Sequence, residues 1–432
     1  MSSATRRTVA AVWRIEAAQV TAVLARTVGD LDLAEDLAQD ALLAALEQWP
    51  RSGVPAKPGA WLLAVARRRA VDAVRRRATL RRKLALLARD LPDGIDPIAA
   101  LDLDRQVGDD ILRLMFTACH PLLGRDARVA LTLRTVAGLS TGEIARAFLV
   151  PSATVGQRIS RAKKTLSDAG VPFEVPAGAE LDARLGSVLE VVYLIFNEGY
   201  AATGGDSWTR AELCAEAMRL GRMLAALASG EPEPHGLVAL MEFQGSRLRA
   251  RTGADGAPVP LDRQDRARWD RLLITHAEGA LRRADGLGGT GSYVLQARIA
   301  ACHARAPDMA ATDWHRIAAL YAELGALTGS PVVALNRAVA VARTGNPAAA
   351  LVLVDELAEL PALRGYHLLP AVRGDLLRTL GHPAEARAQF ERAAAMTGNT
   401  AERTLLLERA RSCLASGTGP DRGSDPAPPA GR

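Results

Sequence analysis

Residues 139–164 read LSTGEIARAFLVPSATVGQRISRAKK, and the pattern of capping and apolar residues in this stretch predicts its local structure. Ser140 can cap the N-terminus of a short helix, and Glu143, three residues later, completes a capping box. Pro151 begins the next helix at a position where its missing N–H removes no hydrogen bond. The spacing therefore predicts two short helices joined by a turn.

The second of these helices carries polar side chains on the side opposite its apolar residues, Val155 and Ile159. Donors at this spacing suit phosphate oxygens and base edges in the major groove of DNA. The alternative is an amphipathic hairpin whose basic side is only solvated. We expect the DNA-facing side to consist of Ser152, Thr154, Gln157, Arg158, Arg161 and Lys163.

A strongly basic helix is expected upstream, where residues 58–77 read PGAWLLAVARRRAVDAVRRR. Nine basic residues and one acid, Asp72, lie between Trp61 and Lys83. Such a stripe is typical of a polyanionic partner. Trp61, at the start of the helix, either packs in the core or stacks on an unpaired base. The apolar spacing predicts a buried side formed by Leu62, Val65, Val71 and Val74.

An acidic helix precedes the basic one, in residues 33–49, which read LAEDLAQDALLAALEQW. Asp36, Gln39 and Asp40 are three and four residues apart, so they share one side of this helix. The opposite side is apolar. Taken alone, this pattern is typical of a solvated surface helix.

The composition indicates an all-α protein, and the charged N-terminus, with no apolar segment behind it, argues against an export signal. Its 432 residues suffice for roughly two to four domains. Hydrophobic residues make up 49% and charged residues 24%, a balance typical of soluble proteins. No uncharged stretch reaches the about 18 residues of a membrane-spanning helix, and four widely spaced cysteines fit a reducing cytoplasm. Alanine and leucine recur three and four residues apart nearly everywhere, which predicts helices throughout.

Residues that could support catalysis or hold a metal are dispersed. The seven histidines are far apart, and the sequence has no phosphate-binding loop, nucleophile elbow or zinc-protease motif. Cys119 and His120 are adjacent, but two ligands do not make a metal site, and a buried cysteine beside a helix end is the better interpretation. We therefore expect no catalytic residue, no metal and no cofactor.

The C-terminal part contains an internal repeat. Gly345-Asn346-Pro347 recurs as Gly381-His382-Pro383 at a spacing of 36 residues, close to the about 34-residue tetratricopeptide period. Pro- and Gly-rich breaks separate the other helical stretches. The expected organisation has helical units at 1–90 and 109–170, a linker at 91–108, a helical array at 180–414 and a disordered tail at 416–432.

The order of an acidic helix, a Trp-led basic helix, a linker and a helix-turn-helix resembles the extracytoplasmic-function (ECF) sigma factors of bacterial RNA polymerase. The resemblance covers about residues 10–170 and implies that residues 1–90 are sigma region 2 and that residues 109–170 are sigma region 4. It implies that the helix-turn-helix reads the −35 element through the six polar residues given above. It implies polymerase binding by Asp36, Leu37, Gln39, Asp40 and Leu43. It implies −10 element contacts by Trp61, Arg67, Arg68, Asp72, Arg75 and Arg76.

The remainder is similar to a group of sigma factors with a large tetratricopeptide-like C-terminal extension. The similarity lies in residues 194–200, 211–217, 330–338 and 365–369. It implies a regulatory or partner-binding extension, and we expect Asp375 and Arg378 on its partner face. The partners implied are core RNA polymerase, promoter DNA and a protein or peptide held by the extension, in the cytoplasm and without a membrane.

Three other interpretations remain open from the sequence. One is a helix-turn-helix regulator that has a tetratricopeptide-type sensor and does not need polymerase. A second is a helical scaffold whose basic stripe is incidental. The third, an enzyme hidden in the extension, lacks any clustered acid, base and nucleophile.

Overall fold

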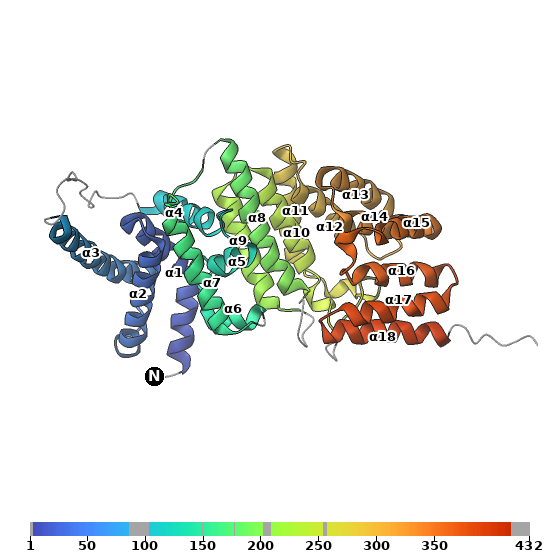
Figure 1. Ribbon diagram of the computed structural model, residues 1–432, viewed down its shortest axis with the longest axis horizontal. Coiled ribbons are helices and arrows are strands. Elements are labelled where there is room, and N and C mark those ends of the chain that lie inside the picture. Colours follow the sequence, from blue (N-terminus) through green and yellow to red (C-terminus); the bar gives the residue numbers. More distant parts are fainter. Residues whose placement is uncertain are drawn as a thin grey trace, which may run out of the picture. The chain divides into compact units, whose positions relative to one another are not determined.

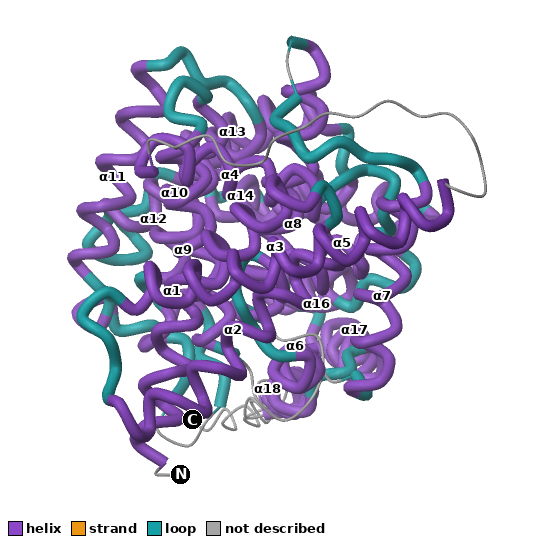
Figure 2. The backbone as a smooth tube through the Cα atoms, turned by 90° about the vertical axis from the view of Figure 1, so that its left-hand side faces the viewer, coloured by secondary structure: helices purple, strands orange, loops and turns teal. Residues whose placement is uncertain are grey.

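The computed structural model describes residues 3–85, 103–148, 150–176, 178–201, 209–253 and 257–415. Within these ranges the chain forms helices and connecting loops and no β-strand, so the predicted all-α fold is confirmed (Figure 2). The predicted tail at 416–432 and most of the predicted linker at 91–108 lie outside these ranges. Among the helices that are described, none is long and apolar enough to cross a membrane.

The chain divides into two compact units. Unit 1 comprises residues 1–199 and 210–241, and unit 2 comprises residues 200–209 and 242–432. The break that the sequence suggests near residues 171–176 lies inside unit 1.

Unit 1 begins with three helices, α1 (Ser3–Val28), α2 (Leu31–Ser52) and α3 (Pro58–Ala85), which pack around a shared apolar core (Figure 1). The side chain of Asp30 caps α2 by accepting hydrogen bonds from the next two backbone N–H groups that lack helical partners, those of Asp32 and Leu33. Burying large side chains such as Trp49 supplies about 1.5–3 kcal/mol each. Gly53, at φ 79°, ends α2, so the helix continues through Pro50.

Four shorter helices follow: α4 (Leu103–Ala118), α5 (Arg125–Thr135), α6 (Thr141–Phe148) and α7 (Ser152–Asp168). The predicted capping box is confirmed at the start of α6. The N–H of Ser140 donates to Glu143 Oε2 over 2.8 Å, and the N–H of Glu143 donates back to Ser140 Oγ over 3.2 Å. The apolar side of α7 is also confirmed, because Val155 and Ile159 are buried.

The last helices of unit 1 are α8 (Ala179–Tyr200), α9 (Ala211–Leu227) and most of α10 (Pro232–Gly245). They are tied to α4 and the turn after it. Arg184 Nη2 donates to the carbonyl of Phe116 over 3.2 Å, and Ser187 Oγ donates to the carbonyl of Cys119 over 2.6 Å. The first helices of the extension therefore share a compact unit with the helix-turn-helix.

Unit 2 is a run of helices joined by short loops and four 3₁₀ turns. The helices are α11 (Arg271–Gly286), α12 (Ser292–Arg305), α13 (Trp314–Thr328), α14 (Pro331–Arg343), α15 (Pro347–Ala358), α16 (Leu368–Thr379), α17 (Pro383–Met396) and α18 (Thr400–Ala415). The 3₁₀ turns are η1 (Leu248–Ala250), η2 (Leu261–Arg263), η3 (Arg266–Arg268) and η4 (Pro361–Leu363). Figure 1 shows α16, α17 and α18 side by side.

The sequence repeat corresponds to two helix pairs, α14–α15 and α16–α17. Gly345 and Gly381 occupy the turns within the pairs at φ 96° and 85°, where a side chain would strain the backbone. Gly374 lets α16 approach α17 closely, since a Cβ there would lie 3.0 Å from the Phe390 ring. In the first pair the buried Val354 takes the place of that aromatic residue.

Candidate nucleic-acid interface

The acidic side of α2 is accessible. Asp36 and Leu43 are exposed, and Gln39 and Asp40 are half-buried on the same side of the helix. Partial burial raises the pKa of Asp36, and repulsion from Asp32 adds to this rise. Leu37, by contrast, lies in the core of the bundle at 6% exposure. Four of the five residues expected to bind polymerase therefore form one surface, and Leu37 only anchors the helix behind it.

A cross-helix ion pair connects this surface to the basic helix. Arg69 Nη1 lies 2.8 Å from Asp40 Oδ2, and both side chains are about half exposed. Exposed pairs of this kind contribute at most about 1 kcal/mol. Asp40 can therefore exchange Arg69 for another partner at little energetic cost.

Trp61 packs against the core of the α1–α3 bundle. Its ring meets that of Trp49 edge to face, with centroids 5.4 Å apart, and its side chain stays partly exposed. Edge-to-face aromatic pairs add about 0.5–1.5 kcal/mol beyond their burial. Of the two alternatives that the sequence left open for Trp61, this contact corresponds to packing in the core.

The basic side of α3 is partly accessible. Arg68, Asp72 and Arg75 are exposed and Arg67 is half-buried, while the side chain of Arg76 lies outside the described part of the structure. Val71 is 39% exposed, so the predicted buried side is wrong at this position. Among the described side chains of α3, burial ends at Ala70, where the helix passes beyond the core.

The polar side chains of α7 have different environments. Ser152, Gln157 and Arg161 are exposed, and Thr154 is half-buried. Arg158 Nη2 lies 3.0 Å from Asp126 Oδ2 of α5. The Lys163 side chain is only 10% exposed.

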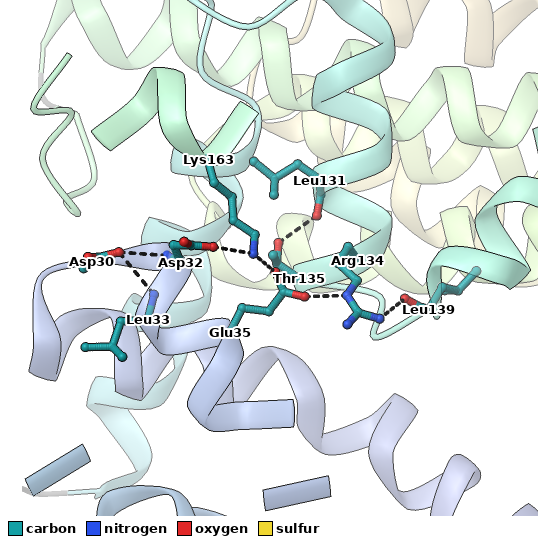
Figure 3. Close-up of polar contacts among 9 residues, drawn as sticks. All are labelled: Asp30, Asp32, Leu33, Glu35, Leu131, Arg134, Thr135, Leu139 and Lys163. Atoms are coloured by element: carbon teal, nitrogen blue, oxygen red, sulfur yellow. Dashed lines mark hydrogen bonds and ion pairs between the residues drawn. The ribbon is translucent and has the colours of Figure 1, made fainter. Parts of the chain in front are cut away.

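Lys163 is buried because it pairs with the first turns of α2 (Figure 3). Its Nζ lies 2.5 Å from Glu35 Oε2 and 2.8 Å from Asp32 Oδ1. On the other side of the same carboxylate, Arg134 Nε of α5 lies 2.5 Å from Glu35 Oε1. Burial lowers the pKa of Lys163, but Glu35 and Asp32 outweigh burial and leave that pKa above its ordinary value. We call Asp32, Glu35, Arg134 and Lys163 the Glu35 cluster.

A second ion-pair cluster joins the same parts of unit 1. Arg26 Nε of α1 lies 2.8 Å from Asp110 Oδ2 of α4, and Arg113 Nη1 lies 2.7 Å from Asp110 Oδ1. Asp110 is fully buried, and burial raises its pKa although both guanidinium groups oppose the shift. Residues expected in region 2 and region 4 are therefore held together by two ion-pair clusters, each around a buried carboxylate.

Sequence reasoning missed the Glu35 cluster, although one signal was present. Glu35 stands in helical register with Ala38 and Ala45, which are buried. An acid within an apolar stripe requires a buried basic partner, because an unpaired buried charge is very costly. The spacing shows that such a partner exists but not that it is Lys163 and Arg134.

Cys119 and His120 follow directly after α4. No group of three or more His, Cys, Asp or Glu side chains is close enough to hold a metal ion in the described ranges. Burial raises the pKa of Cys119 to about 12, although its hydrogen bond with Thr132 opposes the shift. Cys119 is therefore a protonated, inert thiol.

Comparison with known families matches three parts of the chain. Residues 13–79 match Sigma-70 region 2, and residues 113–166 match Sigma-70, region 4. Residues 184–285 match a family of unknown function, DUF6596. The third match begins in α8 and ends in α11, so it includes the helices that pack on region 4.

Two relatives extend these matches. The chain is 45% identical over 392 residues to an uncharacterized protein of Rhizobium meliloti (strain 1021), covering 90% of this chain and 92% of that protein. It is also 29% identical over 168 residues to the probable ECF RNA polymerase sigma factor SigI of Mycobacterium tuberculosis, covering 39% of this chain and 57% of SigI. The chain therefore belongs to the sigma-70 family, as an ECF-like sigma factor that carries a C-terminal extension.

Proposed function

We propose that this sigma factor directs core RNA polymerase to promoters by contacting both the −10 and the −35 elements, and that it works in the cytoplasm. The observation that carries the proposal is the capped helix-turn-helix of α6 and α7. Helix α7 presents Ser152, Gln157 and Arg161 to solvent, with its apolar side buried. This is the arrangement in which a recognition helix enters the major groove.

The α3 helix is proposed to engage the −10 element. Arg68 and Arg75 are seven residues apart, two helical turns, so both exposed side chains lie on one side of α3. Guanidinium groups in such a row bind successive phosphates and release counterions, which supplies affinity without sequence choice. Sequence choice then depends on base-edge contacts from α7 and on unpaired bases held near α3.

The exposed side of α2, formed by Asp36, Gln39, Asp40 and Leu43, is proposed to dock on core polymerase. Leu43 is a large apolar side chain at 55% exposure beside acidic residues. An apolar residue surrounded by charges fits an interface with a small hydrophobic centre and a polar rim. The proposed activity is thus one of recognition, with no covalent chemistry performed by this chain.

Unit 2 is proposed to bind a partner and thereby regulate the sigma function. Asp375 and Arg378 of α16, expected on the partner face, both line a cavity of about 480 Å³. A run of stacked helix pairs presents extended surfaces suited to peptides or helices. The partner-binding role rests on this cavity and on the resemblance of the chain to extended sigma factors.

Run-off transcription with purified core polymerase tests the proposed function. The full-length protein should direct initiation at a promoter that core polymerase alone does not use. Arg161→Ala should reduce specific transcripts, while Arg282→Ala, which removes an exposed arginine of α11 in unit 2, should leave them unchanged. Absence of promoter-dependent transcripts with the unmodified protein, across its own genomic promoters, would contradict the proposal.

A further inference from the structure

Unit 2 contains a cavity whose lining is rich in arginine. It has a volume of about 480 Å³ and lies among α14, α16, α18 and the segment that contains η2. Two acids, Asp262 and Asp375, also line it. We call this cavity the basic groove, after the four arginines that line it: Arg263, Arg343, Arg378 and Arg409.

The arginines that line this groove outnumber the carboxylates that line it. Asp375 forms ion pairs with two of them, with Arg409 Nη1 at 2.9 Å and Arg378 Nη2 at 3.6 Å. Arg263 and Arg343 are exposed and have no ion-pair partner in the ranges that the structure describes. The guanidinium of Arg343 lies instead over the ring of Trp314, 5.8 Å from its centroid. A cavity with two unneutralised guanidinium groups attracts a ligand that brings carboxylates.

A second cavity gives the groove an elongated form. It has a volume of about 500 Å³ and shares Pro260 and Arg263 with the first, so the two meet at this segment. Its other lining residues include Thr400, Thr404 and Glu408 of α18. Two adjoining cavities of this size suit an extended chain, which rises about 3.3 Å per residue, better than one compact small molecule.

The lining residues also favour a peptide over a nucleic acid as the ligand. Asp262, Asp375 and Glu408 lie in or beside the groove, and they would repel a continuous row of phosphates. Among the residues that the structure describes, no aromatic side chain lines either cavity, so unpaired bases would find no stacking surface on them. A peptide can place its acidic side chains on the arginines and neutral residues beside the acids.

We propose that the basic groove binds a short acidic segment of a partner protein, with partner carboxylates seated on Arg263 and Arg343. Arginine suits this role because its planar fork binds a carboxylate through two parallel hydrogen bonds. The proposal rests on the partner-binding role proposed for unit 2. It does not depend on promoter recognition by unit 1.

The probe is a fluorescein-labelled peptide in which glutamates are separated by alanines, and its binding to the full-length protein is followed by fluorescence anisotropy. The double variant Arg263→Glu with Arg343→Glu should weaken binding about tenfold or more, since two charge-assisted contacts are reversed. The matched control is Arg337→Glu with Arg411→Glu. These exposed arginines of α14 and α18 line neither cavity, and the change in net charge is the same. The control should alter the affinity less than about twofold.

Several results would overturn the proposal. They are no saturable binding of the glutamate-alanine peptide, equal binding of the same peptide with glutamine in place of glutamate, equal losses in both double variants, or tighter binding of single-stranded RNA. Circular dichroism and the single variant Arg263→Glu guard against misfolding, and the single variant should still weaken binding. Because the assay contains neither polymerase nor promoter, its failure is distinguishable from a failure of the sigma function.

Discussion

Lys163 Nζ of α7 lies 2.5 Å from Glu35 Oε2 of α2, which ties the helix proposed to read the −35 element to the helix proposed to dock on polymerase. Both side chains are at most 10% exposed. In this arrangement Lys163 has no access to a DNA phosphate. It can reach DNA only after its pairs with Glu35 and Asp32 break, so proposed DNA binding by this residue requires region 4 to move away from region 2.

Glu35→Gln should lower the free energy of unfolding by about 3 kcal/mol. Removing one member of a buried ion pair leaves the other charges uncompensated, here Lys163 and Arg134. Urea unfolding of the full chain, followed by circular dichroism, measures the change. The control is Asp168→Asn at the exposed end of α7. Equal losses in the two variants would show that the Glu35 cluster contributes nothing specific.

The pH dependence of stability should show the raised pKa of Lys163. In the native state Lys163 keeps its proton above its ordinary pKa of 10.5, whereas in the unfolded state it does not. Its contribution is therefore complete below the unfolded pKa and is lost as the pH rises through the native pKa. Urea unfolding at a series of alkaline pH values should show a steeper decline for the unmodified protein than for Lys163→Gln. Parallel curves would contradict this assignment.

Asp36→Arg with Asp40→Arg should abolish the binding of core polymerase. The variant reverses two charges on the proposed docking side of α2, while the ion pair that it removes, Asp40 with Arg69, is about half exposed and contributes little to folding. Co-purification with core polymerase measures binding, and circular dichroism confirms unchanged helicity. The matched control is Asp168→Arg with Glu174→Arg, at two exposed acids outside α2. Full retention of polymerase by the α2 variant would exclude this surface.

Arg161→Ala should weaken promoter binding and flatten its salt dependence. Each phosphate contact that is lost reduces the slope of log affinity against log salt concentration by about 0.9. Gln157→Ala should leave the slope unchanged and relax sequence choice at one base pair, if its amide reads a base edge. Filter binding with the polymerase complex over a range of salt concentrations separates the two effects. Identical slopes for Arg161→Ala and the unmodified protein would place Arg161 away from the backbone.

A chain ending after Pro176 should be less stable than the full-length protein, although the sequence suggests a break between helical units near residues 171–176. The truncation removes Arg184 and Ser187, which bond to the carbonyls of Phe116 and Cys119, together with the apolar face of α8. We expect unit 1 to unfold about 5 °C lower or more, since about 1 kcal/mol corresponds to about 2–4 °C in a domain of this size. Removing only residues after Ala415 is the control. An unchanged unfolding temperature for 1–176 would restore the earlier boundary.

The helices and their order could be predicted from the sequence alone. Capping residues such as Ser140 and Glu143, and apolar spacings such as Val155 to Ile159, act within one or two turns, so they can be found without knowledge of the fold. The exposed residues of α2, α3 and α7 followed from the same periodicity. Their motifs, in this order, also indicated the sigma-70 family, which the region 2 and region 4 matches confirm.

Which charged residues stay accessible depends on the tertiary packing and could not be predicted from the sequence. Periodicity places Lys163 on the polar side of α7, but it cannot show that a carboxylate from α2, far away in the sequence, lies opposite. The prediction for Val71 was wrong for the same reason, because the extent of a core depends on which helices meet. Helix formation is a local property of the chain, whereas burial and ion pairing depend on contacts between segments that the sequence does not bring together.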